Sequence, residues 1–218
     1  MHRLNAVLLT SALALLCLPS QAQEIQPYSC RNGLFPTEGK GALLYRVSSK
    51  QPVHFFNDDK GCPASEACKN KAYIVEGNEV LVSKAEGGWA CVWHQGPQHE
   101  TVGWVAVDTL LPMAEPVPAP DAWLGAWKSY GHAITIKKRE GALLHVSGKA
   151  TWGTGEAKHY GRVDGALRIQ GHHAQTRMGD DQDACLVDLT RIGRYLIVSD
   201  NKNCGGFNVS FDGVYVRE

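Results

Sequence analysis

Short apolar runs, most of them with alternating apolar and polar positions, recur along the chain after residue 40. In residues 42–111 they are rich in β-branched and aromatic residues and are separated by clusters of Gly, Asn, Asp or Pro, which is typical of strands joined by turns. No stretch in this half keeps a helical period for three turns. The expected strands are 42–47, 53–56, 72–75, 79–83, 89–93 and 102–105.

The same pattern continues from residue 121 to residue 218. The expected strands there are 133–137, 142–146, 159–163, 166–169, 185–189, 195–198, 207–211 and 214–216. Turns such as Asp164-Gly165 and Asp212-Gly213 connect them and favour an antiparallel meander. Such a sheet avoids exposed edges by closing into a barrel or by folding into a sandwich. The predicted fold class is therefore all-β.

A proline-rich segment between the two halves predicts a domain boundary. Pro112, Pro116, Pro118 and Pro120 favour an extended, semi-rigid spacer with few backbone donors. We therefore expect a first domain over residues 23–111, a linker over 112–120 and a second domain over 121–218. Each domain is small enough for disulfides to contribute much of its stability.

The first 22 residues have the pattern of a secretory signal peptide. A short basic start precedes an apolar run from Ala6 to Leu18, and the small residues Ser20 and Ala22 fit a cleavage site after Ala22. This predicts a periplasmic or secreted protein. No later stretch approaches the length of about 18 apolar residues that a transmembrane helix needs, so we expect no transmembrane segment.

Each of the two predicted domains holds an even number of the six cysteines beyond the leader, which favours disulfides within each domain. The first domain holds Cys30, Cys62, Cys68 and Cys91, and the second holds Cys185 and Cys204. Four cysteines allow three pairings. We favour Cys62 with Cys68 because they close a short loop, which leaves Cys30 for Cys91, while Cys185 has one partner within its domain. The spacing of a four-cysteine zinc site is absent.

Several motifs of the first domain resemble a bacterial Src-homology-3-like module. They are the strand pair in 72–82, the Gly88-Trp89 strand start, the late Gly103-Trp104-Val105 and the following Leu110-Leu111. In that family a late Gly-Trp strand closes a small barrel. The resemblance covers about residues 40–112. It implies recognition of peptidoglycan stem peptides or a protein segment through an aromatic groove. The 62–68 segment departs from the plain pattern and is similar to a subset of uncharacterised secreted bacterial proteins.

The second domain resembles a lipocalin-like barrel. In such barrels a Gly-x-Trp, here Gly125-Ala-Trp127, starts the first strand, and a late arginine, here Arg217, stacks over that tryptophan. A domain of about 95 residues is short for a lipocalin with a large cavity, so a small and mostly filled barrel is expected. The segment 200–215 looks like the closing motif of the same secreted proteins and implies no activity.

Charge and motifs argue against several classes of function. The 22 basic residues balance the 22 acidic ones, so no basic surplus favours a nucleic-acid partner. Serine-nucleophile, phosphate-loop and histidine metal motifs are absent. The histidines favour solvated or half-buried positions in the sheets over a metal or acid–base site. We expect no catalytic residue, no metal and no cofactor. The histidines beyond the leader are His54, His94, His99, His132, His145, His159, His172 and His173.

Aromatic residues of the first domain give the candidate binding site. Trp89 and Trp93 are four positions apart, so in a regular strand they share one face. Two interpretations stay open, which are core packing and a groove that receives a peptide or glycan stem. The groove would be lined by Trp89, Trp93, Trp104 and Tyr45.

We therefore expect a non-enzymatic binding protein of the bacterial cell envelope that recognises peptidoglycan or a protein partner. One alternative is an inhibitor or immunity protein against a cell-wall hydrolase, in which the loop with Asp180, Asp181 and Asp183 meets a cationic enzyme. Another is a metal-dependent hydrolase that uses the sheet histidines. The sequence leaves the ligand, the domain that binds it and the oligomeric state open.

Overall fold

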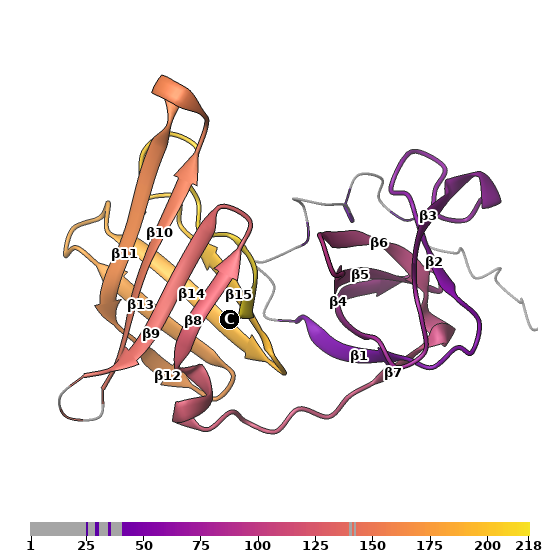
Figure 1. Cartoon of the computed structure of the whole chain (residues 1–218), viewed down its shortest axis with the longest axis horizontal. Helices are drawn as coiled ribbons and strands as arrows, with labels where there is room; N and C mark the ends of the chain where they lie inside the picture. The colour runs from indigo at the N-terminus through magenta and orange to yellow at the C-terminus, as the bar shows by residue number, and fades with distance from the viewer. Residues whose placement is uncertain (1–24, 26–28, 31–34, 36–40, 140, 142) are drawn as a thin grey trace, which may run out of the picture.

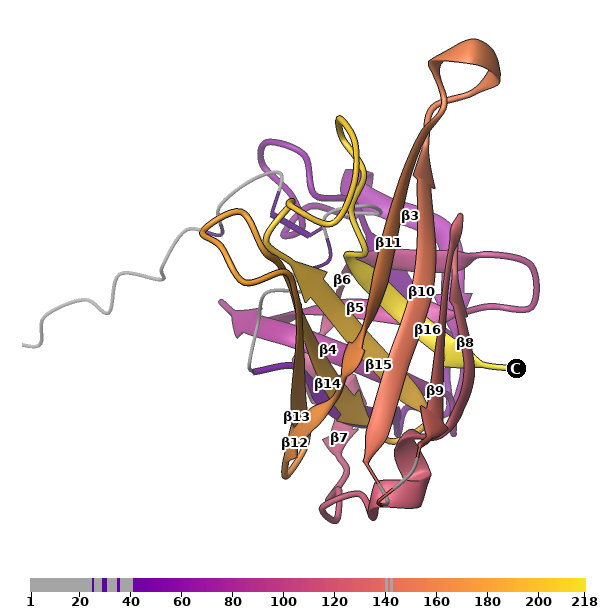
Figure 2. The same cartoon turned by 90° about the vertical axis from the view of Figure 1, so that its left-hand side faces the viewer.

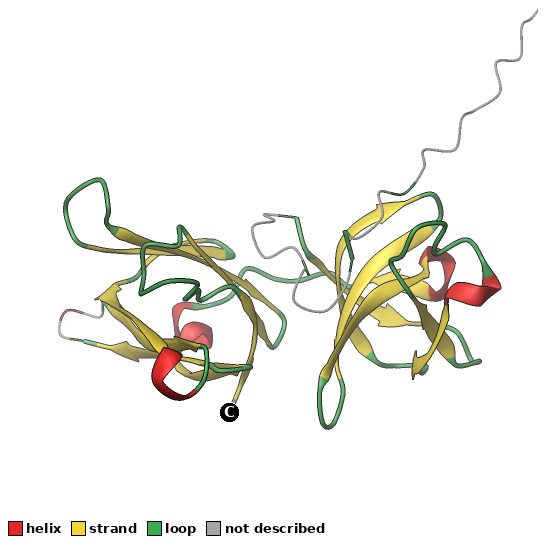
Figure 3. Cartoon of the chain, turned by 90° about the horizontal axis from the view of Figure 1, so that it is seen from above, coloured by secondary structure: helices red, strands yellow, loops and turns green. Residues whose placement is uncertain are grey.

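The computed structural model describes residues 25, 29–30, 35, 41–139, 141 and 143–218 (Figure 1). Within them the chain is all-β, as the sequence predicts, and the helical segments are short 3-10 turns (Figure 3). These are η1 (Glu66–Cys68), η2 (Val107–Thr109), η3 (Pro120–Trp123) and η5 (Gly155–Ala157). The predicted signal peptide and its cleavage site after Ala22 lie outside the described residues.

The first half of the chain forms a seven-stranded sheet in the order β3-β2-β6-β5-β4-β1-β7. Alternate apolar side chains such as Val47, Phe55 and Val92 pack into its core. Each of the six predicted strands overlaps an observed strand, and β7 is additional. The strands are β1 (Leu43–Val47), β2 (Val53–Phe56), β3 (Lys69–Ile74), β4 (Glu79–Glu86), β5 (Trp89–Gln95), β6 (Glu100–Ala106) and β7 (Leu110–Pro112).

The second half forms a nine-stranded antiparallel sheet in the order β11-β10-β9-β8-β16-β15-β14-β13-β12. Most neighbours in this order are also neighbours along the chain, which is the predicted meander. The strands are β8 (Gly125–Ser129), β9 (His132–Lys138), β10 (Leu144–Trp152), β11 (His159–Ala166), β12 (Arg168–Gln170), β13 (His173–Met178), β14 (Cys185–Ile192), β15 (Tyr195–Asp200) and β16 (Gly213–Arg217).

The second sheet curls until its edges nearly meet, so it forms a nearly closed barrel (Figure 2). β11 pairs with β10 and β12 pairs with β13, yet only Leu167 separates β11 from β12 along the chain. The two edge strands therefore form one segment that crosses the opening. Gly165 of β11 lies so close to Thr176 of β13 that a Cβ there would collide with the threonine hydroxyl. This close approach of two strands requires glycine.

The loop 201–208 spans from β11 to β14 across one end of this barrel. Gly205 forms an isolated bridge with Gly161 of β11, and the Arg162 N–H donates to the Cys204 carbonyl at 3.0 Å. The expected strand at 207–211 is wrong, because this segment pairs with no strand. Instead, the Phe211 N–H donates to the Asp200 carboxylate at 2.6 Å.

Buried side chains fill the second barrel, as expected for its size. They include Trp123, Trp127 and Phe211. The guanidinium groups of Arg191 and Arg217 lie 4.9 and 5.8 Å from the Trp127 ring centroid, respectively. Arg217 also donates to the Leu124 carbonyl. The last strand is thus fastened to the tryptophan that starts the barrel.

The two sheets pack against each other through a shared apolar cluster. Trp93 of β5 meets Tyr195 of β15 edge-on, with ring centroids 5.4 Å apart. Ile197 and Val214 from the outer face of the second barrel join the same cluster. Polar contacts flank it, since the Gly193 N–H donates to the Glu115 carboxylate at 2.7 Å.

Three disulfides cross-link the chain, and their pairing is the one that the sequence favours. Cys30–Cys91 and Cys62–Cys68 lie in the first half, and Cys185–Cys204 lies in the second. Cys185–Cys204 ties the loop 201–208 to β14, and Cys30–Cys91 ties the segment before β1 to β5. Persistent disulfides fit a protein that works outside the cytoplasm.

Candidate functional site

The four aromatic residues proposed from the sequence do not line one exposed groove. Trp89 and Trp93 contribute to the same cluster, as their spacing predicts, but Trp93 and Trp104 have exposed fractions of 1% and 0%. Trp89 is half-buried and packs on Phe56 at 4.7 Å between ring centroids. Tyr45 is half-buried against the core of the first sheet.

Two contacts explain the burial of these tryptophans. The second barrel covers Trp93 through Tyr195, and the Trp93 indole N–H donates to Glu100 at 2.8 Å. The indole N–H of Trp104 donates to the buried carboxylate of Asp58 at 2.7 Å. The same carboxylate accepts a hydrogen bond from the Cys30 N–H. Core and interface packing therefore describes Trp93 and Trp104, and a ligand contact through Trp89 or Tyr45 remains a prediction.

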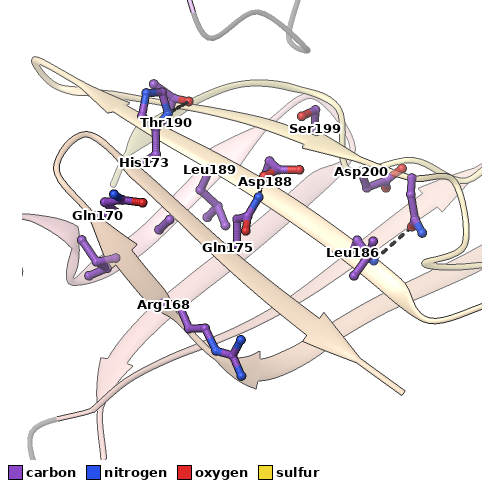
Figure 4. Close-up of a pocket in the computed structure, with 13 residues that line it drawn as sticks. Arg168, Gln170, His173, Gln175, Leu186, Asp188, Leu189, Thr190, Ser199 and Asp200 are labelled. Atoms are coloured by element: carbon purple, nitrogen blue, oxygen red, sulfur yellow. Dashed lines mark hydrogen bonds between the residues drawn. The ribbon is translucent and has the colours of Figure 1, made fainter. Parts of the chain in front are cut away.

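A groove with both polar and apolar surface lies on the outer face of strands β12 to β15, and we call it the outer groove (Figure 4). It has a volume of about 770 Å³. The apolar residues Ala174, Val187 and Leu189 of these strands point into the barrel core. The alternate positions therefore face outward. The groove is lined by Arg168, Ile169, Gln170, His173, Ala174, Gln175, Leu186, Asp188, Leu189, Thr190, Ser199, Asp200 and Asn201.

Strand register arranges the outward side chains of the groove in two rows. One row crosses four strands through Arg168, Gln175, Asp188 and Ser199, which are direct register partners. Because neighbouring strands are about 4.8 Å apart, the Cα atoms of Arg168 and Asp188 are separated by about 10 Å. The side-chain amide of Gln175 between them donates to the Asp188 carboxylate. The guanidinium group of Arg168 and the carboxylate of Asp188 thus lie on opposite sides of the Gln175 amide.

The second row runs parallel to the first, through Gln170, His173 and Thr190. The Nδ1 atom of His173 lies 3.1 Å from the Thr190 hydroxyl. Figure 4 shows His173, Gln175, Asp188 and Thr190 on the same side of two adjacent strands. The groove therefore offers amide, hydroxyl, imidazole and charged groups within one short stretch of sheet. This composition suits reversible hydrogen bonding to a polar ligand.

The segment 200–215, singled out in the sequence, has a structural role. The Asp200 side chain is fully covered and accepts from the backbone N–H groups of Phe211 and Lys202, at 2.6 and 2.8 Å. The side chain of Asn201 accepts from the Leu186 N–H and donates to the Ala184 carbonyl, at 3.0 and 2.8 Å. These contacts hold the loop 201–208 in place beside the outer groove.

Burial shifts the pKa of two groups beside this loop. Burial raises the pKa of the Tyr215 hydroxyl, which donates to the Phe211 carbonyl at 2.8 Å, and the charges of Asp200 and Asp212 act in the same direction. Burial lowers the pKa of His132, and this effect outweighs the same two carboxylates, which oppose it. Both groups are therefore neutral at pH 7 in the folded protein.

The predicted histidines are scattered over both sheets. Of the second-sheet histidines, His145 lies 2.6 Å from an Asp164 oxygen on the outer face, and His159 packs near Trp152 and Phe207. In the first sheet, burial lowers the pKa of His94, whose ring contacts the Glu79 carbonyl at 3.1 Å. No group of three or more His, Cys, Asp or Glu side chains among the described residues is placed to hold a metal ion.

The acidic loop between β13 and β14 is held by an arginine. Arg177 donates to the carbonyls of Gly179 and Asp181, at 3.0 and 2.6 Å. The side chain of Asp181 accepts from the Asp183 N–H at 3.2 Å. Asp180 and Asp183 are exposed at this fixed turn.

Comparisons of the chain with models of protein families, with curated proteins and with solved structures find no match. In the part of the chain that the structure describes, no helix is long and apolar enough to cross a bilayer.

Proposed function

We propose that the protein is a non-enzymatic binding protein of the bacterial cell envelope, and that the outer groove binds a peptidoglycan stem peptide. The observation that carries this proposal is the row of Arg168, Gln175 and Asp188 across adjacent strands. A stem peptide carries carboxylate groups and, in many bacteria, a free amino group. Arg168 is suited to hold a carboxylate, and Asp188 an ammonium group.

The fold supports this use because it preorganises the groove. Four strands of a filled barrel fix the backbone positions of the groove residues. A binding site on rigid strands loses little conformational entropy when the ligand arrives. The Cys185–Cys204 disulfide further fastens β14, which carries Asp188 and Thr190.

Retention of the oxidised mature protein on purified peptidoglycan sacculi tests the proposal. Wild-type protein should be retained, and Arg168→Gln and Asp188→Asn should each lower the affinity by about tenfold, the effect of losing one charge-assisted hydrogen bond. Arg139→Gln and Asp108→Asn, at exposed positions outside the groove, serve as controls of the same chemistry. Equal retention of the wild type and both groove variants, or no retention of the wild type, would contradict the proposal.

A second candidate function is inhibition of a cationic cell-wall hydrolase by the acidic loop. It is favoured by the fixed geometry that Arg177 gives to this loop, which presents Asp180 and Asp183 to solvent. Added protein should then slow lysis of cells by a lysozyme-type enzyme, and salt should weaken the effect. The Asp180→Asn/Asp183→Asn double variant should lose the inhibition. If both proteins inhibit equally, the loop is not the contact.

A further inference from the structure

Four of the five exposed large aromatic side chains in the described residues gather at one end of the second barrel. Only Tyr73 lies elsewhere, on β3. Tyr130 lies in the turn between β8 and β9, Trp152 and Tyr160 at the end of the β10–β11 hairpin, and Phe207 in the loop 201–208. Their exposed fractions are 95%, 46%, 66% and 74%, in that order. A cluster of exposed rings marks an interaction surface.

Two hydrogen bonds hold these three segments together, and we call the surface that they form the aromatic end. The hydroxyl of Thr151 donates to the Gly131 carbonyl at 3.4 Å, which links the β10–β11 hairpin to the turn with Tyr130. The Gly206 N–H donates to the Tyr160 carbonyl at 3.1 Å, which links the hairpin to the loop with Phe207. The rings therefore belong to one site.

The exposed rings occupy both faces of the β10–β11 hairpin. Trp152 and His159 are register partners on one face, where Phe207 lies 6.4 Å from each of them. Tyr160 is the register partner of Thr151, so it faces the other side of the hairpin. On that side the Lys158 ammonium group lies 5.6 Å from the Tyr160 ring centroid. A single flat ligand cannot stack on both sets of rings.

The hairpin is basic as well as aromatic. Residues 149–162 contain Lys149, Lys158 and Arg162 against one acidic residue, Glu156. Lys149 and Arg162 are register partners on the same face as Tyr160. Figure 2 shows the hairpin projecting beyond the acidic loop 179–184. Glu156 lies in the tip beside Lys158, and Lys149 and Arg162 lie behind it on the strands, so the hairpin as a whole offers a net positive charge to a negatively charged surface.

We propose that the aromatic end docks the protein on an anionic phospholipid surface. When a thin hairpin inserts among lipid headgroups, lipid surrounds it, so the rings on both faces of the hairpin can contact lipid. Tryptophan and tyrosine favour the headgroup level of a bilayer. Lys158 and Arg162 are placed to reach lipid phosphates while their apolar stems stay among the rings. This contact is separate from the outer groove, so the protein would hold a cell-wall ligand while it rests on a membrane.

Co-sedimentation with vesicles tests this docking. The oxidised mature protein should sediment with vesicles of phosphatidylglycerol and phosphatidylethanolamine, and much less with phosphatidylcholine alone. Trp152→Ala/Phe207→Ala should lower the affinity by about tenfold or more, since two exposed rings lose their transfer to the interface. Lys158→Gln/Arg162→Gln should remove most of the preference for anionic lipid. Tyr73→Ala, an exposed ring outside the aromatic end, should bind like the wild type.

Fluorescence gives a second readout, because Trp152 is the exposed tryptophan of the described residues. Vesicles should shift the emission to the blue, and Trp152→Phe should abolish the shift while it keeps most of the binding. Wild-type protein that stays in the supernatant, or a folded Trp152→Ala/Phe207→Ala variant that sediments like the wild type, would overturn the proposal. The proposal would also be overturned if the Trp152→Ala/Phe207→Ala variant lost binding to sacculi and kept binding to vesicles, because the aromatic end would then hold a glycan.

Discussion

At the scale of single residues, charged and polar side chains divide into a covered set that shapes the second barrel and an exposed set on its outer face. The carboxylate of Asp200 has no exposed surface and accepts two backbone hydrogen bonds, whereas Asp188 is exposed in the outer groove. The sequence alone does not separate the two aspartates, since both lie in strands that are rich in apolar residues. Which of them faces a loop and which faces solvent depends on strand register.

His132 predicts a pH dependence of stability at this scale. Burial lowers its pKa in the folded protein below the ordinary value, and its Nδ1 atom is buried without a hydrogen-bond partner. The unfolded chain therefore binds a proton more readily than the folded protein as the pH falls through about 6.5. The free energy of unfolding decreases across that range, and the decrease is complete below the lowered pKa of the folded state.

The measurement is the melting temperature between about pH 7.5 and 5.5, where unpaired histidines titrate. Replacing His132 with Gln should make the decrease smaller than in the wild type. His99→Gln, in an exposed loop, is the matched control and should follow the wild-type curve. A His132→Gln curve parallel to that of the wild type would show that His132 is not protonated differently in the two states.

At the scale of elements, the sequence predicts strand positions well and strand partners poorly. All six expected strands of the first half are present, because alternating β-branched and aromatic residues are a local signal. The strand β13 was not expected, since polar residues such as Gln175 weaken the pattern, and β8 was indicated only by the Gly125-Ala-Trp127 motif. The outer groove depends on β13, so the sequence could not indicate it.

The composition of the run 195–198 indicates more than a strand, because it also indicates which faces of that strand are buried. Tyr195, Leu196, Ile197 and Val198 are apolar at every position, which is typical of a strand buried on both faces. One face indeed fills the barrel, and the other packs on the first sheet. The burial of Trp93 follows from this second contact. A strand that is apolar on both faces needs an apolar partner on its outer face, so this run indicates the domain contact that buries Trp93.

The three disulfides are expected to contribute unequally to the free energy of unfolding. Removing each by a double Cys→Ala substitution should destabilise the protein in the order of the sequence separations, which are 61 for Cys30–Cys91, 19 for Cys185–Cys204 and 6 for Cys62–Cys68. Chain entropy predicts losses of about 4, 3 and 2 kcal/mol, respectively. Urea unfolding of each variant measures the losses. A larger loss for the shortest loop than for the longest would contradict loop closure as the main contribution.

At the scale of the whole molecule, the contact between the first sheet and the second barrel makes them one unit. Trp93 and Tyr195 are each almost fully buried in this contact, and Arg194 reaches within 3.9 Å of Glu79 beside it. Since the proline-rich linker alone would leave the two domains free to turn, this cluster determines their relative orientation. The outer groove lies on the barrel face that also provides Ile197, so its position relative to the first sheet depends on the same contact.

Tyr195→Ala is expected to uncouple the first sheet from the second barrel. Removal of a buried ring should cost about 3 kcal/mol or more and leave a cavity against Trp93. Calorimetry should then show two separate unfolding transitions in place of a single cooperative one. The control is Tyr195→Phe, which keeps the ring and should keep the single transition, although it removes the hydroxyl that accepts from Arg194 at 3.1 Å. A single transition at an unchanged temperature for Tyr195→Ala would show that the contact contributes nothing.

The most direct test of the central claim, that the outer groove binds a peptidoglycan stem peptide, is an NMR titration of the isotope-labelled mature protein with a soluble muropeptide. The account predicts that amide shifts concentrate in β12, β13 and β14, around Arg168, Gln175 and Asp188, and that Asp188→Asn removes most of them. Shifts centred on Trp89 and Tyr45 of the first sheet, or no shifts at all, would contradict it.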